Sequence, residues 1–209
     1  MPPYSFEKQR GCSYRLNIYG EHSNIIYNFI CELVPYSVID SGCITLSCAS
    51  IVPLNEYLSA RQNQLSISEC IKLIDNISKA LKYLEKNDLG YYGLDLDDIL
   101  VIDDAYYLIC NTERLMGIRK EMLQINCLIE NCDFSNPEIV SLTELPARIS
   151  LKSVYYSIGL LVIFVLLNRK VAIGSDIEKI IKVLGGSKLY WFIKRCVVSS
   201  SDKRMLLLI

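Results

Sequence analysis

The sequence predicts one compact α+β domain that is mainly α-helical. The 209 residues are 51% hydrophobic and 22% charged, which suits a single domain with its own core. A helix-capping motif at 66–69 opens a long amphipathic pattern, which predicts a helix over 66–87. A continuous apolar run at 154–167 predicts a second, buried helix.

The N-terminal part predicts a β-hairpin followed by a short helix. Residues 27–50 are rich in Ile, Val, Tyr and Cys and are interrupted by Ser41-Gly42, a pattern typical of two short strands joined by a turn. Apolar side chains then recur at helical spacing over 54–58, which predicts a short helix that ends near 62–64.

The long helix has the clearest signal. The hydroxyl of Ser66 and the carboxylate of Glu69 can each satisfy a free backbone N–H at the start of a helix. Apolar residues follow at spacings of three and four, which gives one buried face ending near Asn87. These residues are Ile67, Cys70, Ile74, Ile77, Leu81 and Leu84.

The second half predicts two small strands and then helices. Strands are expected at 99–102 and 106–110 around an acidic turn, whereas 111–150 has no sustained period. The apolar run at 154–167 has 14 residues, fewer than the roughly 20 that cross a bilayer, so we expect a core helix. Two further helices are expected at 176–184 and 189–197.

Charge and cysteine content narrow the function classes. A formal net charge of -1 gives no global field for nucleic acid or an anionic membrane, so neither is expected as a partner. The nine cysteines form no CxxC pair and only one histidine is present, which argues against zinc. Buried thiols without a signal-peptide pattern predict a cytoplasmic protein, in the host cytosol if the source is a virus or an intracellular parasite. A membrane would be involved only if an anchor followed Ile209.

The order of these elements, with several short motifs, resembles the C-lobe of protein kinases. Residues 81–84 followed by 99–109 resemble the run from the long helix through the catalytic loop. Farther on, 136–138 (NPE) resembles the APE triplet, 156–159 (YSIG) resembles W-S-x-G, and 202–204 (DKR) resembles the closing D-x-x-R region.

This resemblance implies a division of the chain into two parts. Residues 53–209 would be a kinase-like helical C-lobe, and 1–52 a reduced N-lobe remnant with a short helix and a β-hairpin. Residues 21–26 (EHSNII) resemble the H-P-N-I turn that follows the regulatory helix of kinases, which would leave about 20 residues before it. That length is too short for three N-lobe strands and a full helix.

The resemblance also implies that the catalytic groups are lost. Gly93 takes the place of the catalytic base, Asp95 that of the catalytic-loop lysine, and Asp98 that of the asparagine that holds a second magnesium. Cys110 begins the triplet at the Asp-Phe-Gly position, and thiolate is too soft a ligand for magnesium. With no GxGxxG loop and no strand lysine, we expect neither kinase activity nor a cofactor or metal.

One structural feature of kinases is expected to remain. Glu138 and Arg204 stand where kinases place a buried ion pair between the activation segment and the last helices. Val154 departs from the family at the usual buried-helix aspartate.

Two clusters allow other interpretations. Several carboxylates over 95–104 could bind magnesium or calcium, but their spacing does not match an EF-hand, so hydrogen bonds to loop amides and a solvated turn at 103–104 are favoured. The tyrosines at 91–92 and 106–107 could form a protein-binding patch, although strand and loop packing is the more common role. Trp191 is expected in the core.

The first functional hypothesis is therefore a catalytically inactive pseudokinase. It would act as a protein-interaction scaffold or allosteric regulator of a partner, such as an active kinase or a larger assembly. One alternative is a degenerate phosphotransferase or nucleotide-binding domain that uses Asp95 or Asp98 in unorthodox roles. Another is the cytosolic pseudokinase domain of a membrane-tethered secretion or signalling component.

Overall fold

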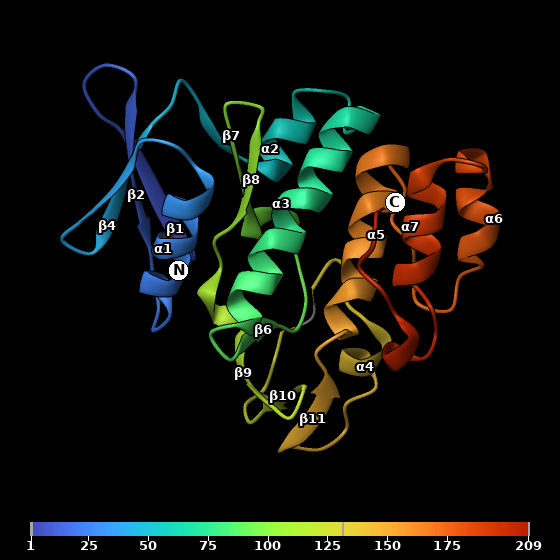
Figure 1. Cartoon of the computed structure of the whole chain (residues 1–209). Coiled ribbons are helices and arrows are strands. Elements are labelled where there is room, and N and C mark those ends of the chain that lie inside the picture. The colour runs from blue at the N-terminus through green and yellow to red at the C-terminus, as the bar shows by residue number, and fades with distance from the viewer. Residues whose placement is uncertain (1, 131, 209) are drawn as a thin grey trace.

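The computed structural model describes residues 2–130 and 132–208 and has an α+β fold, with 39% helix and 24% strand. Figure 1 shows a sheet with one helix at the N-terminal side, a long helix with a hairpin in the middle, and a group of helices at the C-terminal side. One hydrophobic core joins these layers, because its buried residues run from Tyr4 in the first strand to Cys196 in the last α-helix.

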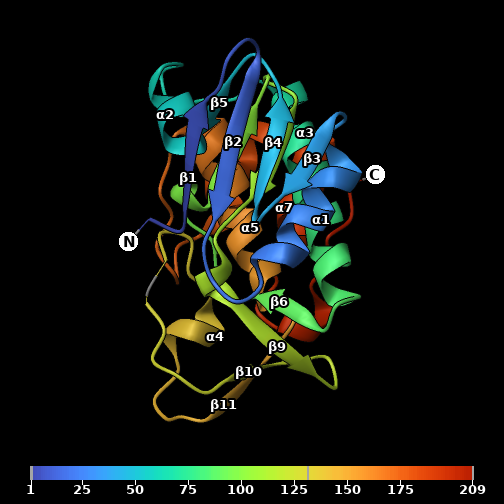
Figure 2. The same ribbon diagram turned by 90° about the vertical axis from the view of Figure 1, so that its left-hand side faces the viewer.

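The N-terminal layer is an antiparallel sheet in the order β1-β2-β4-β3, and helix α1 packs beside β3 (Figure 2). Leu16, Ile44 and Leu46 are fully buried, so one face of the sheet belongs to the core. The elements are β1 (Tyr4–Lys8), β2 (Ser13–Ile18), α1 (Ser23–Leu33), β3 (Ser37–Asp40) and β4 (Cys43–Ser47).

This layer corrects two predictions. The hairpin expected within 27–50 occupies only 37–47, because 27–33 continues α1 with Tyr27 and Ile30 buried on one face. Residues 21–26 do not form a turn after a helix: His22 is the N-cap of α1, and β1 and β2 precede it. The segment before residue 53 was expected to hold one hairpin and a short helix. It also contains the hairpin formed by β1 and β2.

The middle layer agrees with the prediction for the long helix and the small strands. The capping box of Ser66 and Glu69 forms at the start of α3, and Ser66 Oγ accepts a hydrogen bond from Glu69 N at 3.3 Å. Strand β7 pairs with β5 and β8, and the short helix α2 ends a few residues earlier than expected. The elements are β5 (Ile51–Pro53), α2 (Leu54–Ser59), α3 (Ile67–Glu85), β7 (Ile99–Ile102) and β8 (Tyr106–Ile109).

Residues 111–150, which lack a sustained sequence period, hold most of a third sheet in the order β11-β10-β9-β6. Its buried side chains, including Leu123, Ile125 and Ile149, form a second small core. The elements are β6 (Leu89–Tyr91), β9 (Leu115–Arg119), β10 (Met122–Ile125), α4 (Pro137–Val140) and β11 (Ala147–Ser150).

The apolar run forms helix α5 (Ser153–Leu167), which packs against both α3 and α7 (Lys188–Cys196). The short helix α6 (Ile177–Ile181) lies between α5 and α7 in sequence, as predicted. Over the described residues, no helix is both long and apolar enough to cross a membrane.

Two side-chain predictions have different outcomes. Tyr91, Tyr92 and Tyr107 are buried and Tyr106 is partly buried, so these tyrosines serve packing. Trp191 was expected in the core, but it is 51% exposed, because α7 turns Phe192 and Ile193 toward α5 and leaves Trp191 on the opposite face. Six of the nine free cysteines are buried, whereas Cys12 and Cys127 are exposed.

Candidate functional site

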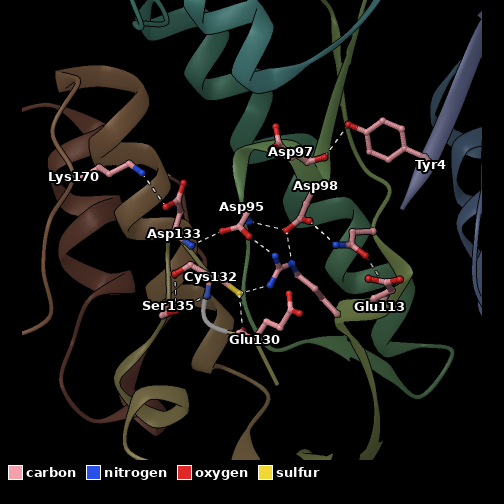
Figure 3. Close-up of polar contacts among 12 residues, drawn as sticks. Tyr4, Asp95, Asp97, Asp98, Glu113, Glu130, Cys132, Asp133, Ser135 and Lys170 are labelled. Atoms are coloured by element: carbon pink, nitrogen blue, oxygen red, sulfur yellow. Dashed lines mark hydrogen bonds and ion pairs between the residues drawn. The ribbon is translucent and has the colours of Figure 1, made fainter. Parts of the chain in front are cut away.

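The candidate site surrounds the loop at 92–98, between β6 and β7. A 3-10 turn at Leu96–Asp98 closes this loop, and a second one at Thr112–Arg114 follows β8. Because β7 and β8 form the tight hairpin that separates the two turns in sequence, the turns are brought side by side. The segment at 132–136 covers them from the other side (Figure 3).

The Arg114 guanidinium lies between two carboxylates of the loop. Its Nη2 atom bonds Asp95 Oδ2, and its Nε atom lies 2.9 Å from Asp98 Oδ2. The Arg114 side chain is only 11% exposed and that of Asp98 only 2%. Water therefore screens the pair with Asp98 weakly, unlike an ordinary surface pair, whereas the Asp95 side chain is 23% exposed and its pair is screened more.

The remaining carboxylate oxygens also face protein donors. Asp98 Oδ1 accepts a hydrogen bond from Asn111 Nδ2 at 2.7 Å, and Asp98 Oδ2 also accepts one from Asp95 N at 2.6 Å. Asp95 Oδ1 accepts a hydrogen bond from Asp133 N (Figure 3). All four oxygens of Asp95 and Asp98 are thus engaged by N–H groups of the chain.

Burial dominates the electrostatics of this cluster. Burial raises the pKa of Asp98 and of Asp95 above the usual value of a carboxyl, although Arg114 acts on both in the opposite direction. Burial lowers the pKa of Arg114, but Asp98 and the other neighbouring groups outweigh it, and the net pKa is raised. Arg114 therefore stays charged and is the cation that balances the two carboxylates.

Gly93 lies against Cys132 at the edge of the cluster. A Cβ atom at Gly93 would come within 2.6 Å of Cys132 Sγ, closer than real Cβ contacts allow. The Cys132 thiol also accepts a hydrogen bond from Arg114 Nη1, and burial raises its pKa to about 12. The space that a side chain at position 93 would need is therefore filled by a neutral thiol.

The N-terminal sheet contacts the same loop. The Tyr4 hydroxyl in β1 donates a hydrogen bond to the backbone oxygen of Asp97 at 2.8 Å (Figure 3). Thr112 Oγ1 donates to the backbone oxygen of Tyr19, which follows β2. These two contacts tie the sheet directly to both 3-10 turns.

Glu138 and Arg204 form the predicted ion pair at some distance from this cluster. Arg204 is fully buried, and its two terminal nitrogens donate to the carboxylate of Glu138 at 2.7 and 2.9 Å. The remaining N–H groups of Arg204 donate to backbone oxygens of Ser153, Val198 and Ser199. The pair therefore connects α4, the start of α5 and the chain after α7.

The structure brings together only part of the predicted site. Asp95, Asp98 and Gly93 lie in one loop, but the Cys110 thiol, just after β8, donates weakly to Leu108 O and forms no hydrogen bond with either carboxylate among the described residues. Asn111 faces Asp98 instead, because successive residues of an extended chain point to opposite sides.

Sequence reasoning missed Arg114 and Cys132. No local motif surrounds either residue, and 18 positions separate them. Within 2–130 and 132–208, no three His, Cys, Asp or Glu side chains are arranged to hold a metal ion together. Asp103 and Asp104 lie away from the site. Asp103 accepts hydrogen bonds from the backbone N–H groups of Ala49 and Ser50, and Asp104 forms an ion pair with Arg61.

Comparison with known proteins finds no protein-family model that matches this chain and no curated protein similar to it in sequence.

Proposed function

We propose that this chain is a pseudokinase-type domain that binds a protein partner and does not transfer phosphoryl groups. The order of its elements supports the kinase-like part of the proposal: a small sheet with one helix, a long helix, a catalytic-loop-like segment, a β-hairpin and a buried apolar helix. In this interpretation α1 takes the place of the regulatory helix, and Glu138 with Arg204 takes the place of the structural ion pair.

The engagement of all four oxygens of Asp95 and Asp98 by protein donors is the observation that carries the proposal. At the position that Asp98 takes in this interpretation, a kinase needs an open amide oxygen to hold magnesium on the nucleotide phosphates. Here Arg114 supplies the positive charge that a metal would supply. Magnesium could bind these oxygens only by displacing a buried guanidinium and leaving it without partners.

The packing at Gly93 supports the same conclusion about catalysis. A general base must lie within hydrogen-bond reach of the substrate hydroxyl, and Gly93 has no side chain to reach it. Since Cys132 fills the adjacent space, an aspartate at position 93 would also have to displace the segment that covers the loop. The hydrogen bond from the Tyr4 hydroxyl to Asp97 O also joins the N-terminal sheet directly to this loop.

Thermal unfolding with and without ATP and magnesium tests the proposal. A ligand at about 100 times its Kd stabilises a protein by about 2.7 kcal/mol, which corresponds to roughly 5–11 °C for a chain of this size. We expect no shift of the unfolding temperature and no transfer of labelled phosphate to protein substrates. A shift of this size that Asp98→Ala abolishes would refute the proposal and support the nucleotide-binding alternative.

A further inference from the structure

A groove lies between α1 and the C-terminal half of α3, on a part of the surface that the catalytic-loop-like segment does not reach. Its floor is apolar: Phe29 and Leu33 come from α1, and Tyr83 comes from α3. The rings of Phe29 and Tyr83 are in contact, with their centroids 5.3 Å apart. The two helices therefore form one apolar floor, in which Phe29 is buried and Leu33 and Tyr83 are partly exposed.

The rim of this groove is basic. Lys79 and Lys82 of α3 and its C-cap residue Lys86 line the groove, and spacings of three and four residues place them on one exposed face. Lys79 pairs with Asp75 at 2.7 Å. Among the described residues, neither Lys82 nor Lys86 has an ion-pair partner. Two ammonium groups without an ion pair thus stand beside an apolar floor, and Glu32 is the one carboxylate among the residues that line the groove.

The size of the groove limits what it can hold. Its volume is about 270 Å³, which is below the roughly 300–1,000 Å³ of small-molecule sites. One or two apolar side chains of a protein segment fit such a space better than a cofactor does. Three lysines next to Asp75 and Glu32 are also too few for the extended basic surface that nucleic acid needs.

We infer that this lysine-rimmed groove docks an acidic segment of a protein partner, which places an apolar side chain on Phe29, Leu33 and Tyr83 and carboxylates beside Lys82 and Lys86. Charge complementarity selects the acidic segment, and the apolar floor supplies the desolvated centre that protein interfaces require. This inference does not depend on the kinase-like interpretation, because it concerns a different surface.

Binding of a fluorescein-labelled peptide of glutamates around two central leucines tests the inference by fluorescence anisotropy. We expect the wild type to bind this peptide, to bind less tightly as salt increases, and to bind poorly a matched peptide with glutamines in place of the glutamates. Lys82→Glu/Lys86→Glu should weaken binding by about tenfold or more, because two attractive rim charges become repulsive.

Two variants serve as matched comparisons. Lys179→Glu/Lys182→Glu changes the net charge equally on exposed lysines of α6 and the turn after it, and should change the affinity less than about twofold. Glu32→Gln removes the carboxylate that lines the groove and should tighten binding. Because Glu32→Gln removes a repulsion from a surface position, its effect does not depend on any loss of folding.

Three results would overturn the inference. The first is no binding of the acidic peptide by the wild type. The second is an equal loss of affinity in Lys82→Glu/Lys86→Glu and Lys179→Glu/Lys182→Glu. The third is tighter binding of a single-stranded oligonucleotide, or of phosphatidylserine vesicles, through Lys82 and Lys86, since either would identify a different class of partner.

Discussion

Replacing Arg114 by methionine should destabilise the fold more at neutral pH than at mildly acidic pH. The substitution keeps much of the apolar stem and removes the charge, which leaves Asp95 and Asp98 facing each other without a cation. Breaking a buried ion pair costs about 3–5 kcal/mol. Asp98 keeps its bonds from Asn111 and Asp95 N, so we expect the lower end, about 3 kcal/mol.

The assay is urea and thermal unfolding. For a chain of this length, about 3 kcal/mol corresponds to a fall of roughly 6–12 °C in the unfolding temperature, out of a total stability of about 5–15 kcal/mol. Arg119→Met is the matched control. Arg119 is exposed on β9 and has no ion pair among the described residues, so its removal should leave the midpoint unchanged.

The pH dependence follows from the direction of the pKa shifts. In the wild type the pKa of Asp98 and of Asp95 is raised, so the folded state binds protons more readily than the unfolded state. The stabilisation that comes from protonating Asp98 and Asp95 is therefore complete below the ordinary pKa of a carboxyl. It is lost as the pH rises through the pKa values that the two groups have in the folded state. Arg114 lowers both pKa values, so removing it moves this loss to higher pH.

The stability of Arg114→Met should consequently approach that of the wild type on acidification. In addition, Asp98→Asn should cost less in the Arg114→Met background than alone, with a coupling free energy of about 0.5–3 kcal/mol. An Arg114→Met variant as stable as Arg119→Met at neutral pH, or a destabilisation that grows on acidification, would refute the reasoning.

Three further changes probe the framework by urea unfolding. Glu138→Ala should lower the free energy of unfolding by about 3–5 kcal/mol, because it leaves the Arg204 guanidinium buried without a counter-charge. Glu138→Leu combined with Arg204→Met should recover much of this loss. Equal instability of the two variants would contradict the expectation. Gly159→Ala should destabilise the fold by about 1–3 kcal/mol. The added Cβ would lie 2.6 Å from Val197 Cγ1, where α5 packs closely against the end of α7. An unchanged unfolding midpoint would show that α5 and α7 can move apart. Ser66→Ala should cost about 1 kcal/mol through loss of the N-cap of α3, whereas Ser66→Asp should retain most of the stability.

Local patterns were sufficient for the elements that carry their own signal. The capping box at Ser66 and the apolar spacing behind it located α3, and the uninterrupted apolar run located α5, because both helices satisfy their backbone hydrogen bonds within one segment. The strands β7 and β8 were equally clear, since an acidic turn joins two short β-branched and aromatic runs.

Elements whose stability comes from distant partners were missed. Strand β9 pairs with β6 and with β10, and its residues have no period of their own, so only the assembled sheet makes them a strand. The same reason explains why the hairpin predicted over 27–50 began too early, at residues 27–33. Its residues have high strand propensity, but Tyr27 and Ile30 lie on the buried face of a helix that packs beside β3.

The sequence by itself determined that the chain lacks a side chain at Gly93 and has carboxylates at Asp95 and Asp98. Only the tertiary structure decided what those carboxylates do, because Arg114 reaches them from a segment that follows the β7-β8 hairpin, and Asp133 N reaches Asp95 from 38 positions away. Residue types are fixed along the chain, but the partner of a buried charge depends on which segments fold against it. In this protein the partner is a guanidinium of the chain itself.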